Sequence, residues 1–405
     1  MYNSILPMSL AASDHNRPAY EVADIFHRYG DAYRANHNMT KKQHEVMWAI
    51  KHCRTDRLGY HIDQCNRCDY MEQSFNSCRD RHCPKCQGIA RHKWVTARLQ
   101  QILPVPYYHV VFTLPHDLIS LTAYNRRLIF NLLFDCAAKT LLSFGEDPRW
   151  LGGEAGFYGI LHTWGQTLWP HPHVHIIMPG GALTKDGQWV TPPHRSRFLF
   201  PVRALSKVFR GKFVAGLKQA HCRKNLTLPN GHPAATHGFE VWINHLVSRS
   251  WVVYCKSPVK STSQVLRYIA RYTHRVAIGN HRIINIDREQ VQFHYKDYKK
   301  NRTERQTMTL NAAGFISRFL WHVLPAGFHK IRHYGFMANG RCKERIAYIK
   351  NLLSADNSGK TTITADNSVP LCPRCKTGVL VPLFICSMIK RQNPIIRNGY
   401  LFDTS

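Results

Sequence analysis

Residues 169–178 have the sequence WPHPHVHIIM. This apolar run is bounded by proline on one side and by Pro-Gly-Gly on the other, so it predicts a short buried strand. Successive side chains of a strand point to opposite faces, so we expect His173 and His175 to share one face while Val174 and Ile176 pack behind them. Two imidazoles on one face can bind one divalent ion. The alternative is a solvated strand edge, because a chain with 25 histidines contains such pairs by chance.

A second predicted strand precedes the histidine strand, in residues 159–166 (GILHTWGQ), and is expected to pair with it in an antiparallel hairpin. Mg²⁺ and Mn²⁺ recruit oxygens as well as imidazoles, and one strand supplies only two nitrogens. We therefore expect a third metal ligand, for which the candidates are Gln166 and His162. The register of the hairpin decides between them.

A pair of tyrosines follows in residues 263–275 (SQVLRYIARYTHR), whose apolar residues recur at helical spacing. Tyr268 and Tyr272 are four residues apart, so on a helix both phenols would point the same way. Arginines repeat with a similar period beside them, and a basic flank suits a phosphate backbone better than a protein core. The alternative is two tyrosines of the core. The flanking residues, our candidates for DNA contact, are Arg267, Arg271 and Arg275.

Phosphodiester chemistry connects the two pairs. A tyrosine hydroxyl has a pKa of about 10 and attacks a phosphodiester poorly, so a nearby cation must stabilise the phenolate and the pentacoordinate phosphate. The histidines and tyrosines together predict a metal-dependent nuclease that cuts single-stranded DNA by joining it to tyrosine.

The chain closely resembles the two-tyrosine HUH transposases of the IS91 type. The resemblance covers roughly residues 45 to 350. It is carried by NSCRDRHCPKCQ (residues 76–87), LPVPYYHVVFTLP (103–115), HTWGQ (162–166), HPHVH (171–175), PGG (179–181), YIARYTHR (268–275) and IRHYGF (331–336).

That resemblance implies a rolling-circle-like transposase. In the family the histidine pair binds the metal, Mg²⁺ or Mn²⁺, and both tyrosines act as nucleophiles that form 5′-phosphotyrosine links and release a 3′-hydroxyl. The matching positions here are His173, His175, Tyr268 and Tyr272. The implied partners are single-stranded DNA at the ends of the mobile element and target DNA. Because no helicase motor is evident, host replication or helicase functions would open the strands.

Two other functions fit parts of this pattern. A plasmid replication initiator or a relaxase would use the same histidine and tyrosine chemistry. A non-catalytic, zinc-dependent DNA-binding protein would use the tyrosines for packing alone.

The charge balance predicts a nucleic-acid partner. The chain has 55 Lys and Arg against 25 Asp and Glu, a formal net charge of +30. This exceeds what solubility requires and suits a polyanion. The tyrosine region is itself basic, with 12 Lys or Arg against 4 acids between residues 256 and 305.

Cysteines near the N-terminus predict a structural zinc site. Two CxxC pairs, Cys65 with Cys68 and Cys83 with Cys86, are separated by the segment 69–82, a spacing that suits one tetrahedral ion bound by four thiolates. A second site could use Cys53, His61, Cys78 and His82, although buried free cysteines and surface histidines explain these residues equally well. The module would fold around zinc and offer Arg79, Arg81 and Lys85 to DNA.

The order of predicted elements favours an α+β fold, because strands return between helices expected at residues 118–142 and 203–220. We expect a zinc-binding, DNA-binding module in residues 1–100, followed by the tyrosine nuclease in 101–350. The resemblance implies a palm-like nuclease domain with a central antiparallel sheet and flanking helices.

The remaining residues, 351–405, look like a polar linker and a tail. In this tail Cys372 and Cys375 form half a zinc site to which Cys386 could contribute. Without a secretory pattern or a run of transmembrane length, we expect a cytoplasmic, bacterial protein that is nucleoid-associated when bound and has no membrane partner.

Overall fold

The structure is a computed structural model of the 405-residue chain. It describes residues 18–88, 94, 96–98, 101–192, 199–259, 276–297, 305–355, 371–388 and 394–397. The predicted tyrosine helix lies outside these described residues, and so do Tyr268, Tyr272, Arg267, Arg271 and Arg275.

The chain forms two compact units. The first unit comprises residues 1–87, 278–317 and 365–405, and the second comprises residues 88–277 and 318–364. Both units are discontinuous in sequence. The sequence instead predicts three consecutive ranges, 1–100, 101–350 and 351–405.

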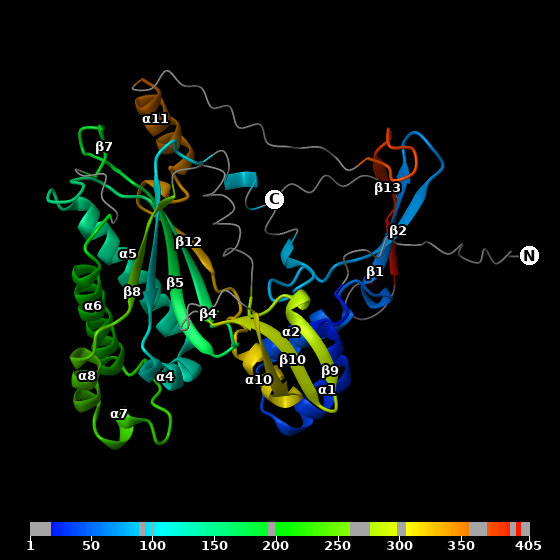
Figure 1. The fold of residues 1–405 in the computed structure, drawn as a ribbon, viewed down its shortest axis with the longest axis horizontal. Coiled ribbons are helices and arrows are strands. Elements are labelled where there is room, and N and C mark those ends of the chain that lie inside the picture. The colour runs from blue at the N-terminus through cyan, green and yellow to red at the C-terminus, as the bar shows by residue number, and fades with distance from the viewer. Residues whose placement is uncertain are drawn as a thin grey trace, which may run out of the picture. The chain divides into compact units, whose positions relative to one another are not determined.

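A five-stranded antiparallel sheet forms the centre of the second unit (Figure 1). Its strand order is β12-β4-β5-β3-β8. The strands are β3 (Tyr107–Thr113), β4 (Phe157–Trp164), β5 (Pro170–Pro179), β8 (Val253–Val259) and β12 (Ile331–Tyr334). The histidine strand is therefore confirmed as β5, and it lies at the middle of the sheet between β4 and β3.

Helices of the second unit supply the rest of its core. They are α4 (Ile119–Tyr124), α5 (Arg126–Glu146), α6 (Val202–Cys222), α7 (Pro233–Thr236), α8 (Phe239–Ser248) and α11 (Cys342–Ala355). The single helix expected at residues 118–142 is divided at Asn125. The Asn125 side-chain nitrogen donates to the carbonyl of Leu121 at 2.9 Å, and its oxygen accepts from the amide of Thr227 at 2.8 Å. These bonds hold Asn125 at a φ of −123° and a ψ of 36°, outside the helical range.

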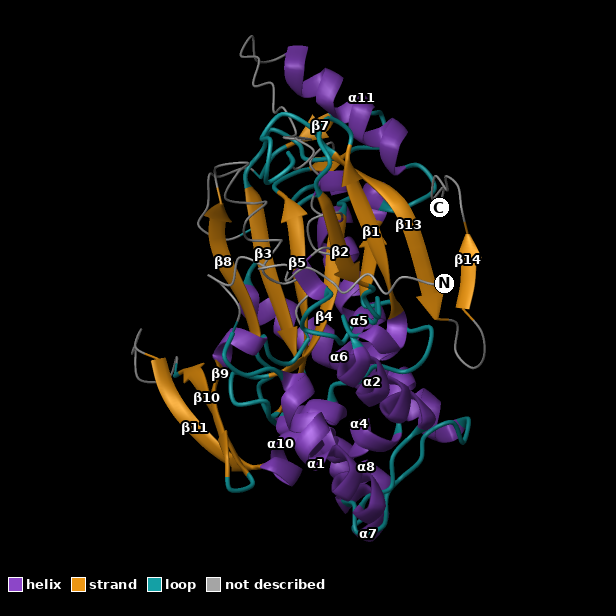
Figure 2. Ribbon diagram, turned by 90° about the vertical axis from the view of Figure 1, so that its right-hand side faces the viewer, coloured by secondary structure: helices purple, strands orange, loops and turns teal. Residues whose placement is uncertain are grey.

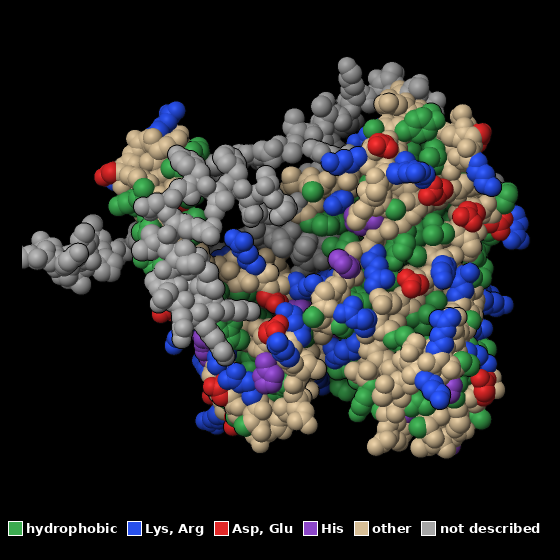
Figure 3. Space-filling model, turned by 180° about the vertical axis from the view of Figure 1, so that it is seen from behind, with side chains coloured by type: hydrophobic (Ala, Val, Ile, Leu, Met, Phe, Trp, Pro, Cys, Tyr) green, Lys and Arg blue, Asp and Glu red, His purple; other side chains and the backbone are tan. Residues whose placement is uncertain are grey.

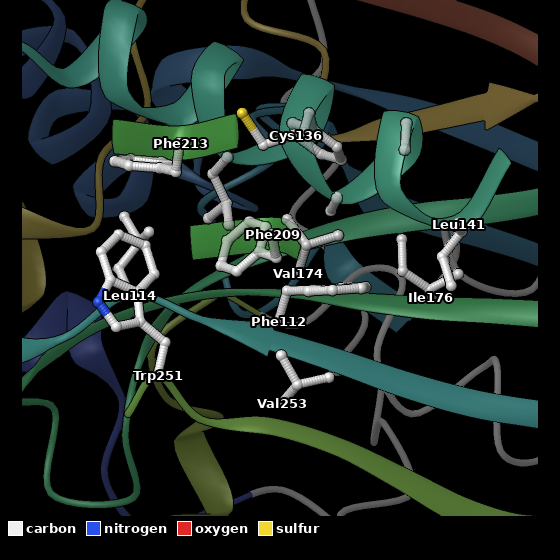
Figure 4. Close-up of a cluster of buried hydrophobic side chains, with 14 of the residues drawn as sticks. Phe112, Leu114, Cys136, Leu141, Val174, Ile176, Phe209, Phe213, Trp251 and Val253 are labelled. Atoms are coloured by element: carbon white, nitrogen blue, oxygen red, sulfur yellow. The ribbon is translucent and has the colours of Figure 1, made fainter. Parts of the chain in front are cut away.

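One face of the sheet packs on α5 and α6. Alternate residues of β3 and β5, including Phe112, Val174 and Ile176, point into this core and are fully buried (Figure 4). Phe209 of α6 packs against them, with its ring 4.9 Å from that of Phe112, and Phe213 packs beside Phe209 and Trp251. Because β-strand side chains alternate, the residues between them must face the other side of the sheet.

Helix α5 is, among the described residues, long and apolar enough to cross a membrane by length and composition. More than half of its most apolar 18-residue window, 56%, is buried inside the protein. This burial explains the composition, because a helix that packs on a sheet and on neighbouring helices is apolar on most sides.

Gly335 follows β12 and fits its position for two reasons. Its φ of +58° lies in the left-handed region that side chains disfavour. A Cβ at this position would also overlap the carbonyl oxygen of Ala155. Glycine therefore lets β12 turn closely against the segment that precedes β4.

The first unit contains helices and a three-stranded sheet. Its elements are α1 (Val22–Asn36), α2 (Lys41–His52), β9 (Ile283–Asp287), β10 (Gln290–Lys296), β11 (Arg305–Asn311) and the start of α10 (Ala312–Trp321). The amide of Val22 donates to Asn280 Oδ1 at 3.2 Å, and Arg28 donates to the carbonyl of Ile286 at 2.9 Å. Segments that are distant in sequence are thus hydrogen-bonded within this unit.

A second sheet of the first unit joins the two ends of the described chain. Its order is β14-β13-β1-β2, with β1 (Gly59–Cys65), β2 (Met71–Phe75), β13 (Leu380–Met388) and β14 (Pro394–Arg397). The early strands β1 and β2 and the late strand β13 lie side by side in both views (Figures 1 and 2). With helices flanking antiparallel sheets, the predicted α+β class is confirmed.

Candidate metal centre and nuclease site

Four histidines gather on the sheet face that points away from α5 and α6. They are His109 of β3, His162 of β4, and His173 and His175 of β5. His109, His162 and His175 are 3%, 5% and 7% exposed. The predicted alternation of β5 is confirmed, since Val174 and Ile176 belong to the core on the other face.

Hydrogen bonds orient the histidine pair so that the two Nε2 atoms face each other. His173 Nδ1 lies 2.6 Å from the carbonyl oxygen of His171, so Nδ1 carries the proton and Nε2 keeps its lone pair. His173 Nε2 and His175 Nε2 are 3.1 Å apart. Two ligands about 2.1 Å from one octahedral ion would be separated by about 3.0 Å. The pair therefore fits adjacent positions on a single metal ion.

The other nitrogen of His175 is hydrogen-bonded to His109, which was not among the site residues predicted from the sequence. His175 Nδ1 lies 2.7 Å from His109 Nε2, and the two rings stack with their centroids 5.0 Å apart. If His175 binds metal through Nε2, its Nδ1 must donate to His109. Partners of this kind fix the tautomer and orientation of metal-binding histidines.

His162 completes a three-histidine cluster. It lies opposite His173 in the β4–β5 register, and one ligand atom from each of His162, His173 and His175 lies within 4.8 Å of the others. The other candidate, Gln166, lies in the loop between β4 and β5. Register thus brings His162 to the histidine pair, and Gln166 stays an alternative ligand.

Burial keeps the pair in the form that binds metal. Loss of solvent lowers the pKa of His173 to about 3. Burial also holds the pKa of His175 well below its usual value, with a further contribution from the neighbouring histidines and Lys330. Both imidazoles are neutral at physiological pH, as coordination requires.

Two cationic side chains lie against the β4–β5 hairpin, which carries His162, His173 and His175. Lys330 is 9% exposed, and its ammonium lies 5.2 Å from the centre of the Trp164 ring. Arg318 stacks at 5.1 Å over Trp169 and donates to the carbonyl of Thr167 at 2.9 Å. Both cations can bind a phosphate, and Lys330 lies close enough to His175 to lower its pKa. Sequence reasoning did not find them, since they come from elements much later in the chain than the histidine strand.

The cysteines form two clusters, and the members of each differ from the predicted sets. Cys83 and Cys86 lie with Cys53 and Cys78, while Cys65 and Cys68 lie with two cysteines of the C-terminal segment, Cys372 and Cys375. In the first cluster the sulfur of Cys86 is 3.5 Å from that of Cys53 and 3.6 Å from that of Cys78. The predicted grouping of Cys65, Cys68, Cys83 and Cys86 is therefore corrected.

The β1–β2 hairpin explains this correction. Cys65 and Cys68 lie at its turn, whereas Cys53 and Cys78 lie beyond its open end, where the Arg54 amide donates to Asn76 at 3.1 Å. Seven residues of extended strand separate the two ends by about 20 Å. Strand β2 lies between the two CxxC pairs and is extended, so Cys65 and Cys68 are too far from Cys83 and Cys86 to bind the same ion.

The predicted second set also changes. Cys53 and Cys78 join the first cluster, but the two histidines have other partners. His61 Nδ1 lies 3.1 Å from Asn76 Oδ1, and His82 Nδ1 lies 2.8 Å from Asp80 Oδ1. His82 is 1% exposed, so Asp80 stabilises a buried imidazole.

The three DNA-contact candidates of the zinc module differ in exposure. Arg79 and Arg81 are exposed, whereas Lys85 is half-buried. The Lys85 ammonium lies 2.6 Å from a carboxylate oxygen of Glu21 and 3.3 Å from the carbonyl of Cys53. Its contacts hold α1 and the first cysteine cluster together. More widely, Lys and Arg side chains are spread over the face seen in Figure 3, with fewer Asp and Glu among them.

Comparisons with known proteins agree with this architecture. A family described as "Putative transposase" matches residues 156–345, and one described as "Transposase zinc-binding domain" (IS91) matches residues 25–114. A relative from Sinorhizobium fredii, "Putative transposase y4qJ", is 41% identical over 91% of this chain and 96% of its own length.

The chain belongs to the IS91-type transposase family. A second relative, "Transposase for insertion sequence element IS801" of Pseudomonas savastanoi pv. phaseolicola, is 27% identical to the transposase over 78% of this chain and 75% of its own. No solved structure matches. The matched ranges contain the cluster of Cys53, Cys78, Cys83 and Cys86 and all of the histidine cluster, so the transposase combines a zinc-binding domain with a DNA-processing domain.

Proposed function

We propose that this transposase cleaves and rejoins single-stranded DNA through 5′-phosphotyrosine intermediates, in a metal-dependent, rolling-circle-like reaction. One observation supports the metal site most directly. The Nε2 atoms of His173 and His175 converge at 3.1 Å while each Nδ1 is engaged by another group, which is the arrangement expected of metal ligands held ready.

The residues present fit a divalent ion. His162, His173 and His175 would hold it through three imidazole nitrogens, and oxygens of the DNA phosphate and water suit the remaining positions of Mg²⁺ or Mn²⁺. When bound, such a metal polarises the phosphate and stabilises the charge that develops on its oxygens. Lys330 adds positive charge beside His175, and Arg318 adds positive charge at the loop between β4 and β5.

Tyr268 and Tyr272 are the proposed nucleophiles. The phenol oxygen of one tyrosine loses its proton to solvent and attacks phosphorus, the bond from phosphorus to the 3′ oxygen breaks, and that oxygen takes up a proton. The protein is left joined to the 5′ phosphate. In the reverse direction a 3′-hydroxyl attacks the phosphotyrosine, so rejoining needs no external energy. A second tyrosine lets one site hold one strand while it cuts another.

The proposed substrates are single strands at the ends of the mobile element and target DNA. The strongly basic composition supports a polyanionic partner. Host replication or helicase functions would supply these single strands.

A covalent adduct tests the proposal. Labelled single strands from the element ends are incubated with the transposase and Mn²⁺ or Mg²⁺, and the products are separated on a denaturing gel. We expect a metal-dependent adduct that is absent when Tyr268 and Tyr272 are both changed to Phe, and absent in His173→Ala. Tyr254→Phe is a matched control, because Tyr254 is an exposed tyrosine of β8 outside the proposed pair.

Two results would contradict the proposal. An adduct that persists in the Tyr268→Phe, Tyr272→Phe double variant would exclude these residues as the nucleophiles. DNA binding without any adduct from authentic ends would favour a zinc-dependent DNA-binding protein in which the tyrosines serve packing.

A further inference from the structure

The second cysteine cluster joins two parts of the chain that are distant in sequence. Cys65 ends β1 and Cys68 lies in the turn that follows it, while Cys372 and Cys375 come from the turn before β13. The sulfur atoms of Cys65 and Cys375 are 3.7 Å apart, and those of Cys68 and Cys372 are 3.8 Å apart. Four thiolates at about 2.3 Å from one tetrahedral zinc ion would be separated by about 3.8 Å. The cluster therefore has the size of a zinc site.

Hydrogen bonds to sulfur give a second indication of thiolate ligands. The amide of Arg67 donates to Cys65 Sγ at 3.3 Å, and the amide of Gly378 donates to Cys375 Sγ at 3.2 Å. The hydroxyl of Thr377 also lies 3.5 Å from Cys375 Sγ. Donors of this kind stabilise a negatively charged sulfur, so both CxxC turns are built to present thiolates.

The backbone around the cluster is already in place for such a site. The amide of Asn66 donates to the carbonyl of Val379 at 3.0 Å, and the amide of Val379 donates to Asn66 Oδ1 at 2.9 Å. Beyond these bonds, β1 pairs with β13 from Cys65 opposite Leu380 to Gly59 opposite Ser387, with one register shift between Ile62 and Asp63. The sheet register thus aligns the two turns at one end of the sheet.

Other arrangements of the four thiols fit less well. In the described residues all four are free cysteines rather than disulfides. Cys386, the additional ligand considered from the sequence, lies within β13 opposite Tyr60 and away from the turn. With two sulfurs from each turn and tetrahedral spacing, the cluster is a closed four-ligand site.

We propose that Cys65, Cys68, Cys372 and Cys375 bind a structural Zn²⁺ ion that fastens residues 371–388 to the β1–β2 hairpin. Cys372 and Cys375 lie outside both matched family ranges, 25–114 and 156–345, so this site extends the zinc-binding domain into the C-terminal segment. The proposal gives the transposase two zinc ions, because the cluster of Cys53, Cys78, Cys83 and Cys86 has the ligands to hold the other. The proposal is independent of the tyrosine chemistry.

Metal content of the purified full chain tests the proposal. We expect two zinc ions per chain in the wild type and one in the double variant Cys372→Ser, Cys375→Ser, measured by elemental mass spectrometry. Cys222→Ser is the matched control and keeps two, because Cys222 is an exposed cysteine at the end of α6. A wild type that holds one zinc, or a double variant that holds two, would overturn the second site.

Differential alkylation of the wild type covers the case in which the variant does not fold. A thiol-alkylating reagent is applied to the native chain with and without a zinc chelator, and each cysteine is quantified by peptide mass spectrometry. We expect Cys68 and Cys375, which are half-buried, to be protected until zinc is removed and then to react together. Cys222 should react at once in both samples. Reaction of Cys375 at the same rate with and without chelator would refute the site.

Discussion

His109 offers the sharpest test of the histidine cluster, because it contacts the proposed metal ligand His175. The proposed change is His109→Phe, which preserves an aromatic ring but removes the nitrogen 2.7 Å from His175 Nδ1. We expect Mn²⁺ to bind more weakly, while the sheet remains folded.

The magnitude follows from the tautomer of His175. In the metal-free variant the proton can move from Nδ1 to Nε2, where the His173 Nε2 lone pair, 3.1 Å away, accepts it. Metal binding forces the proton back to Nδ1, where the variant no longer offers the His109 nitrogen as an acceptor. Removing one partner of a buried hydrogen bond costs about 1–3 kcal/mol, and 1.4 kcal/mol is a tenfold change in affinity. The dissociation constant for Mn²⁺ should therefore rise by about 5-fold to 150-fold.

Isothermal titration of Mn²⁺ into the purified full chain measures this change, and His109→Gln is the matched control. The glutamine oxygen can accept from His175 Nδ1, so this variant should recover most of the affinity. Wild-type affinity in His109→Phe would refute the role assigned to the bond. An equal loss in His109→Gln would show that packing, rather than the acceptor, matters.

Three further predictions address other residues. His162→Ala should weaken Mn²⁺ binding more than Gln166→Ala in the same titration, because the β4–β5 register places His162 beside His173. A greater loss of affinity in Gln166→Ala would make Gln166 the third ligand. Lys85→Ala should lower the midpoint of thermal unfolding, because the substitution removes a half-buried ion pair with Glu21. In a fluorescence-anisotropy titration it should reduce DNA affinity less than Arg79→Ala, because Arg79 is exposed. A larger loss of affinity for Lys85→Ala would show that Lys85 contacts DNA. Gly335→Ala should lower the midpoint of thermal unfolding or the soluble yield, because the new Cβ would overlap the Ala155 carbonyl and residue 335 has a positive φ. Gly340→Ala is the control and should leave both unchanged, because the space around its Cβ is open.

The local part of the site could be predicted from sequence because alternation in a strand is a property of the backbone. Apolar residues at 174 and 176 faced the core, so the histidines at 173 and 175 had to face the other way. His109 follows the same alternation in β3, but the sequence does not say which strand lies beside which. Its contact with His175 depends on the β3–β5 pairing, which joins segments that are distant along the chain.

The grouping of cysteines could not be predicted for a related reason. The number of residues between two CxxC pairs limits the greatest distance between them. It does not show whether those residues form an extended hairpin, which holds the pairs apart. The true partners of Cys65 and Cys68 lie near the other end of the chain, at Cys372 and Cys375. Only the pairing of β1 with β13 brings them together. The same long-range pairing makes the first unit discontinuous, which composition does not reveal.

The β1–β13 pairing has a consequence for how the chain folds during synthesis. The ribosome makes β1 before any residue of the second unit and makes β13 after all of them, since residues 88–277 and 318–364 lie between. Until then the nascent β1 strand has a free edge on the side that β13 will occupy, and free edges can pair with other chains. The second unit can fold as soon as its own residues emerge. Completion of the first unit is therefore a late event, and a chain that terminates early retains an open sheet edge and two unmatched thiols.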